Sequence, residues 1–144
     1  MKLIFLDIDG VLNNCMSSGV FHESSTIYGC ITELNRILLT SEAGIILISN
    51  WKDSYDFKII KNLLLYERGI YQHSILGLTS IGINKEEGIT HFLKNPPLEI
   101  DNFIIIDDNL DMKDELLRSK YIKTESMIGL TQIEADLAIQ KLLQ

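Results

Sequence analysis

Cysteine and long apolar runs are both scarce in this sequence of 144 residues. Its two cysteines, Cys15 and Cys30, are too few for a scaffold built on disulfides, so we expect reduced thiols. The longest purely apolar runs span about four residues, far short of the ~20 that a membrane-crossing helix needs. The run that follows Met1-Lys2 stops at Asp7, which is too early for a signal peptide. We therefore expect a cytoplasmic protein with no membrane partner.

Basic residues are also in deficit. The chain has 13 lysines and arginines against 20 aspartates and glutamates, which gives a net charge of −7. A generic nucleic-acid-binding protein would instead carry a basic face. The composition therefore gives no strong sign of generic nucleic-acid binding, although a local basic patch stays open. The sequence does not indicate an oligomeric state.

The composition is otherwise that of an ordinary globular protein. Apolar residues make up 46% of the chain and charged residues 23%. A chain of this length is typical of one domain, which buries roughly 70% of its unfolded surface. We therefore predict a single domain over residues 1–144 that needs no covalent cross-links.

Three short apolar runs share one arrangement, in which the run ends on polar or acidic residues. Residues 3–6 lead to Asp7 and Asp9, residues 45–48 to Ser49 and Asn50, and residues 103–106 to Asp107 and Asp108. Such runs are typical of strands buried on both faces of a parallel sheet. Carboxylates there need a cationic partner, because burying an unpaired charge is costly. Since ligands of open α/β sheets bind beyond the carboxyl ends of the strands, we predict one crevice that holds Asp7, Asp9, Ser49, Asp107 and Asp108.

Helix and strand patterns alternate along the rest of the chain. Helices are predicted over residues 27–39, 54–68, 85–93, 112–119 and 132–143, the last capped by Thr131. Strands are predicted over 2–8, 45–49, 72–76, 103–107 and 121–124, with a loop over 13–25. This alternation predicts an α/β fold, a three-layer Rossmann-like parallel sheet with helices on both faces. The strand over 2–8 should be central, between the strands that end at Ser49 and Asp107.

The segment Asp7-Ile8-Asp9-Gly10-Val11 resembles the first motif of the haloacid dehalogenase (HAD) superfamily, Asp-x-Asp-Gly-[Thr/Val]. Ser49, Lys85 and the pair Asp107-Asp108 resemble its second, third and fourth motifs, in the family's order. The resemblance implies a HAD-like fold and a HAD-type phosphatase, a phosphoric monoester hydrolase. The segment Phe5-Leu6-Asp7-Ile8-Asp9-Gly10-Val11-Leu12-Asn13, together with the aromatic Trp51 after the second motif, is also similar to small HAD domains associated with RNA repair.

The resemblance also implies a role for each motif residue. Asp7 would be the nucleophile that forms an aspartyl-phosphate, and Asp9 the general acid and base. Lys85 would be the catalytic cation beside Asp7 and the phosphate. The residues implied to contact the phosphate are Gly10, Ser49, Asn50 and Lys85.

One Mg²⁺ ion is implied as the cofactor. Asp7 and Asp108 would be carboxylate ligands, with Asp107 as the competing candidate, and Asp9 would contribute its backbone carbonyl. Mg²⁺ prefers octahedral oxygen ligands, with few carboxylates and several waters. It would neutralise charge while an anionic nucleophile approaches an anionic phosphate. Asp111 has two readings, as an outer contact of the metal site or as the N-cap of the helix that follows.

The spacing of the motifs leaves no room for a substantial cap domain of the kind that many members of the superfamily carry. The segments between Asp7 and Ser49 and between Ser49 and Lys85 are nearly used up by core elements. The loop over 13–25 is the only obvious lid. We expect a phosphorylated substrate, either a small molecule or an exposed phosphate on a larger molecule. For Trp51 we expect core packing, with substrate binding as the alternative.

Two other functional classes stay open. A receiver-like phosphoacceptor domain shares the acidic cluster, a hydroxyl residue and a lysine, but its acceptor aspartate ends a later strand. A non-catalytic interaction module on a related fold is the other alternative. Asp9 favours an enzyme, because it supplies an acid and base that a slow phosphoacceptor does not need.

Overall fold

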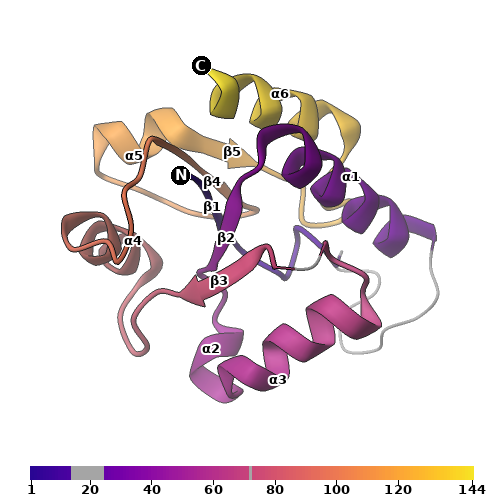
Figure 1. The fold of residues 1–144 in the computed structure, drawn as a ribbon, viewed down its shortest axis with the longest axis horizontal. Coiled ribbons are helices and arrows are strands. Elements are labelled where there is room, and N and C mark those ends of the chain that lie inside the picture. Colours follow the sequence, from indigo (N-terminus) through magenta and orange to yellow (C-terminus); the bar gives the residue numbers. More distant parts are fainter. Residues whose placement is uncertain (14–24, 72) are drawn as a thin grey trace.

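The computed structural model of the chain describes residues 1–13, 25–71 and 73–144. Its centre is a parallel sheet of five strands in the order β3-β2-β1-β4-β5 (Figure 1). The strands are β1 (Lys2–Leu6), β2 (Gly44–Leu47), β3 (Ile75–Leu78), β4 (Asn102–Asp107) and β5 (Tyr121–Lys123). As predicted, β1 is central, and it pairs in parallel with β2 on one side and β4 on the other. The strand order reverses at β1 and β4, which is where open α/β sheets place their ligands.

Both faces of the sheet are buried, which explains why its strands are apolar at consecutive positions. In β1, Ile4 and Leu6 face one apolar cluster, whereas Leu3 and Phe5 face the other. All four side chains are 0% exposed. Full burial of one side chain of this size contributes roughly 1.5–3 kcal/mol, so these four residues make β1 a major part of the core.

Helices cover each face. On one face α1 (Ser25–Ser41) and α6 (Gln132–Leu143) lie side by side, and α3 (Phe57–Asn62) contributes to the same apolar cluster (Figure 1). On the other face lie α4 (Lys85–Lys94) and α5 (Glu115–Lys120). The protein is therefore a three-layer α/β fold. No inserted domain interrupts the described elements, and residues 14–24, which hold most of the predicted lid, lie outside the described part of the chain.

The prediction of one continuous helix over residues 54–68 is wrong. A short turn, α2 (Trp51–Ser54), comes first, and Tyr55 then adopts an extended backbone with φ −128° and ψ 145°. Asp56 starts a new helix by accepting a hydrogen bond from the backbone N–H of Lys58, at 3.0 Å. The helix α3 then widens into one π-helical turn, η1 (Leu63–Glu67). The side-chain periodicity continues through the break, so it could not reveal the interruption.

Other boundaries differ by a few residues. The strand predicted over 72–76 is found at β3, after His73 with a left-handed φ of 66°, while residue 72 lies outside the described part. The helix predicted over 112–119 begins at Glu115, because Asp114 and not Asp111 is its N-cap. The cap at Thr131 is confirmed and forms a capping box with Glu134. No helix in the described residues is long and apolar enough to cross a membrane.

Candidate active site

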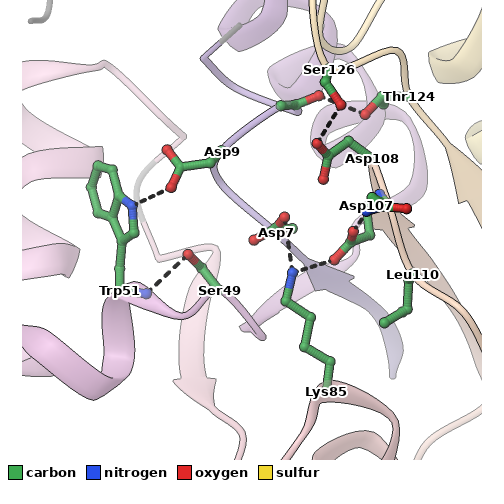
Figure 2. A network of polar contacts seen from close by, with 12 residues as sticks. Asp7, Asp9, Ser49, Trp51, Lys85, Asp107, Asp108, Leu110, Thr124 and Ser126 are labelled. Carbon is green, nitrogen blue, oxygen red and sulfur yellow. Dashed lines mark hydrogen bonds and ion pairs between the residues drawn. The ribbon is translucent and has the colours of Figure 1, made fainter. Parts of the chain in front are cut away.

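The carboxyl ends of β1, β2 and β4 bring the predicted residues to one edge of the sheet (Figure 2). Asp7 directly follows β1, and its backbone N–H donates to the Ile106 carbonyl of β4 at 3.0 Å. Asp107 is the last residue of β4. Ser49 follows β2 and is 2% exposed. Parallel pairing in register thus converts three separate stretches of sequence into one cluster of polar side chains.

Lys85 joins two of the buried aspartates. Its Nζ lies 3.1 Å from Asp7 Oδ2 and 2.7 Å from Asp107 Oδ2. It reaches them from the first residue of α4, whose start is fixed by Asn84, because the Asn84 side chain accepts from the backbone N–H of Glu87. Both carboxylates are buried, and Asp107 is 0% exposed. Breaking such a buried pair by removing one partner typically costs about 3–5 kcal/mol, so the lysine stabilises the cluster as well as the fold.

Burial raises the pKa of Asp7 from its ordinary value of 3.8 to about 7, and the negative charge of Asp107 adds to the rise. Lys85 opposes this shift but does not cancel it. Burial by itself would lower the pKa of the Lys85 ammonium, yet the two carboxylates outweigh it and the pKa is raised. In this cluster of described residues, one lysine thus faces several carboxylates. This excess of negative charge is the electrostatic condition under which a metal cation binds.

Asp108 completes a group of three carboxylates. One oxygen each of Asp7, Asp107 and Asp108 lies within 4.8 Å of the others, close enough to share a metal ion. Ser126, in the segment after β5, donates its hydroxyl to Asp108 Oδ2 at 2.6 Å. Gly10 makes room for Asp108, because a Cβ on Gly10 would lie 2.2 Å from Asp108 Oδ2. Its φ of 77° is also one that other residues rarely adopt.

Asp9 lies on the other side of Asp7 and is exposed (Figure 2). Asn13 Nδ2 donates to Asp9 Oδ1 at 2.8 Å, and Trp51 Nε1 donates to Asp9 Oδ2 at 2.8 Å. The backbone N–H of Trp51 donates to Ser49 Oγ at 3.2 Å. Trp51 also packs against the apolar core, as predicted, but that packing is only part of its environment.

The loop after β1 is tied to the last strands. Thr124, buried after β5, donates its hydroxyl to the Gly10 carbonyl at 2.7 Å, and its backbone N–H donates to the Asp107 carbonyl at 3.1 Å. The Tyr121 hydroxyl donates to the same Asp107 carbonyl at 3.2 Å and accepts from the backbone N–H of Leu110 at 3.1 Å. These contacts fix the two acidic motifs relative to each other.

A polar groove of about 1120 Å³ opens beside Lys85. It runs along α4, where Thr90, His91 and Lys94 line it, and Asn50 after β2 also contributes. Its other wall comes from the segment after β4 and includes Lys113. The groove also contains four acidic residues, Glu86, Glu87, Asp111 and Asp114. It is therefore a hydrogen-bonding surface of mixed charge that adjoins the site and is large enough for more than a phosphate group.

A family model described as the HAD domain in Swiss Army Knife RNA repair proteins matches residues 3–135 of the chain. The chain belongs to this HAD family. The match agrees with the sheet order, with the acidic ends of β1 and β4, and with the lack of a cap among the described residues. Neither a curated protein nor a solved structure shows detectable similarity to the chain.

Several residues of this HAD domain were not predicted as parts of the site. Asn13 was predicted only as the first residue of a loop, although its side chain donates a hydrogen bond to Asp9. Thr124 and Ser126 follow β5, and the rule that polar residues after a strand face the site would have found them had it been extended to this short strand. For Trp51, no feature of the sequence distinguishes an indole that only packs from one that also donates a hydrogen bond.

Proposed function

We propose that this HAD domain is a Mg²⁺-dependent phosphatase that works through an aspartyl-phosphate on Asp7. The observation that carries the proposal is the buried group formed by Asp7, Lys85 and Asp107, with Asp108 beside it. A carboxylate held against a lysine at the end of a central strand can act as a nucleophile. Membership of the HAD family supports hydrolase chemistry at the level of the superfamily.

The donor set fits a hard divalent cation. Mg²⁺ prefers carboxylate and other oxygen ligands, and three carboxylate oxygens lie within 4.8 Å of one another here. Asp108 can be one of the three because Gly10 has no Cβ to occupy the space of its side chain. In our proposal Asp7 and Asp108 hold the ion, together with the backbone carbonyl of Asp9. When bound, the ion supplies charge neutralisation for the approach of an anionic nucleophile to phosphate.

The residues of the chain would divide the reaction into two steps. In the first, a carboxylate oxygen of Asp7 attacks phosphorus, the bond to the leaving oxygen breaks, and Asp9 gives that oxygen a proton. In the second, Asp9 takes a proton from water, the water oxygen attacks phosphorus, and the bond to Asp7 breaks to release phosphate. Ser49 Oγ and the Lys85 ammonium would hold phosphoryl oxygens through both steps.

The groove along α4 supports a substrate that extends beyond its phosphate. A leaving group there would meet amide, hydroxyl and imidazole groups from Asn50, Thr90 and His91. The family's link to RNA repair proteins suggests a phosphorylated end of a nucleic acid as the first macromolecular substrate to test. Lys94 and Lys113 could contact a further phosphate despite the acidic charge of the whole chain.

The test is hydrolysis of p-nitrophenyl phosphate with Mg²⁺ and with EDTA, for the wild type, Asp7→Asn and the control Asp136→Asn. We expect Mg²⁺-dependent turnover that falls to background in Asp7→Asn and persists in the control, which removes an exposed carboxylate of α6 outside the site. Turnover that survives EDTA or Asp7→Asn would refute the proposal. Phosphorylation of Asp7 without release of phosphate would instead favour the receiver-like alternative.

A further inference from the structure

Trp51 connects two residues with different expected roles. Its indole Nε1 donates to Asp9 Oδ2 at 2.8 Å, and its backbone N–H donates to Ser49 Oγ at 3.2 Å (Figure 2). Asp9 is therefore fixed relative to Ser49 through one residue, although the two motifs are far apart in the sequence. Asn13 holds the other oxygen of the same carboxylate, at 2.8 Å from Asp9 Oδ1. Both oxygens of an exposed aspartate are thus held by neutral donors.

We propose that Trp51 is a positioning residue for proton transfer, which aims the Asp9 carboxyl at the leaving oxygen of a phosphate bound at Ser49. This inference rests on the proposed phosphatase function. An exposed aspartate samples several rotamers in the absence of contacts, whereas two hydrogen bonds select one. Holding a catalytic group in its reactive geometry is a large part of what an active site contributes. The indole does this without adding charge to a site that must bind an anion.

The position of the indole argues against a primary role in stacking with substrate. Trp51 is half-buried, packs against the apolar core, and has the Tyr55 ring against it edge to face, with ring centroids 6.2 Å apart. Its N–H points to Asp9 (Figure 2). A ring held in this way is rigid, and a rigid donor keeps Asp9 in place between turnovers.

The effect of losing the indole N–H depends on the leaving group. In the first step an alkoxide needs the proton of Asp9 as the bond from phosphorus to oxygen breaks, whereas p-nitrophenolate leaves without it. In the second step water must lose a proton to Asp9 whatever the first substrate was. Trp51→Phe keeps an aromatic ring and the backbone bond to Ser49 but removes the donor. It should therefore slow attack on alkyl phosphates and breakdown of the aspartyl-phosphate, and spare attack on p-nitrophenyl phosphate.

The kinetic test uses rapid mixing with p-nitrophenyl phosphate and with glycerol phosphate. For Trp51→Phe we expect an unchanged burst rate of p-nitrophenolate, a roughly tenfold lower single-turnover rate on glycerol phosphate, and more acid-trapped phosphoenzyme in the steady state. KM for both substrates should change little, because Ser49 and Lys85 are intact. The control Tyr55→Leu loosens the packing around the indole but keeps its N–H, and it should leave the ratio of the two rates unchanged.

Three outcomes would overturn the positioning role. An equal fall in the rates of attack on both substrates in Trp51→Phe would mean that the variant only disturbs the fold. A rise in KM with unchanged single-turnover rates would mean that the ring binds substrate. The same change of ratio in Tyr55→Leu would assign the effect to packing.

An NMR measurement that does not depend on enzymatic activity tests the hydrogen bond from Trp51 to Asp9 directly. Trp51 is the only tryptophan of the chain, so its indole gives one ¹H–¹⁵N signal that needs no assignment. Asp9→Ala should move this signal and speed its exchange with water, whereas the control Asp108→Ala should leave it nearly unchanged. If neither the position of the indole signal nor its exchange rate changes in Asp9→Ala, the inference is overturned, whether or not the protein is a phosphatase. Inactive wild-type protein with a responsive signal would instead refute the proposed function, and the positioning role would fall with it.

Discussion

Replacing Asp7 by asparagine should stabilise the metal-free protein progressively, relative to the wild type, as the pH rises from 5 to 8, although it removes the proposed nucleophile. The reason is the raised pKa of Asp7, about 7 in the fold against an ordinary value of 3.8, which burial causes first and Asp107 second. Between these two values the folded state binds a proton that the unfolded chain has lost. The contribution of Asp7 to stability is therefore fully present below about pH 4 and is lost as the pH rises through about 7. The asparagine side chain of the variant does not titrate in this range, so the variant escapes this loss.

The size of the effect follows from the same shift. Each pH unit within the window changes the free energy of unfolding by about 1.4 kcal/mol, so raising the pH from 5 to 8 should favour the variant by about 2–3 kcal/mol. For a chain of this size the difference in Tm between the two proteins should then move by roughly 6–12 °C. Taking the difference removes the pH effects that both proteins share.

The assay is thermal unfolding of both proteins in EDTA at pH 5 and pH 8, with Asp9→Asn as a control for loss of a nearby but exposed charge. Adding Mg²⁺ at pH 8 should stabilise the wild type, by about 2.7 kcal/mol at a concentration 100 times Kd, and the Asp7→Asn variant much less. A Tm difference that stays constant from pH 5 to pH 8 would show that Asp7 is not desolvated in the metal-free fold. A difference that moves the other way would show that Lys85 dominates its electrostatics.

Two other substitutions test how the site is built into the fold. Gly10→Ala should destabilise the protein by more than about 1 kcal/mol and weaken Mg²⁺ binding, because the new Cβ would clash with Asp108 and the backbone there is left-handed. The control Gly69→Ala, with φ 75° and open space around the new Cβ, should show only the cost of the left-handed backbone in thermal melts. Lys52 is 3% exposed and donates to Thr79 Oγ1 at 2.5 Å, and burial is the main reason that its pKa is lowered. Lys52→Met should therefore raise Tm at pH 7, because it removes a buried charge, and this gain should shrink as the pH approaches 10. A lower Tm for Lys52→Met at pH 7 would mean that the ammonium stabilises the fold.

Much of the fold and the main site could be predicted because the same residues serve both. A strand buried on two faces must be continuously apolar, so an aspartate directly after such a run stands out in the sequence. Asp7 and Asp107 carried this signal, and parallel pairing of β1 with β4 then brings them together. Lys85 was identified differently, from its resemblance to the third HAD motif at the start of a predicted helix, and the structure adds that Asn84 caps this helix.

The parts that escaped prediction depend on contacts without a periodic signature. The break at Tyr55 replaces one helix by two, because a single extended residue and the cap at Asp56 outweigh a side-chain pattern that suits a continuous helix. The bond from Ser126 to Asp108 and the bond from Trp51 to Asp9 join segments that are far apart in sequence. Their partners become neighbours only after the sheet has formed.

The surroundings of Asp107 and Asp108 suggest a division of labour between the two adjacent carboxylates. Asp107 is 0% exposed, and its oxygens accept from Lys85 Nζ at 2.7 Å and from the backbone N–H of Asn109 at 2.9 Å. Giving up the bond from Asn109 to a metal would leave a backbone donor unpaired, at a cost of about 1–3 kcal/mol. Giving up the bond from Lys85 would remove the shorter of the two carboxylate contacts of its ammonium. Asp108 is half-buried, and Ser126 engages one of its oxygens, Oδ2. We therefore favour Asp108 as the direct ligand, with Asp107 holding Lys85 in place so that its positive charge lies between the nucleophile and the phosphate.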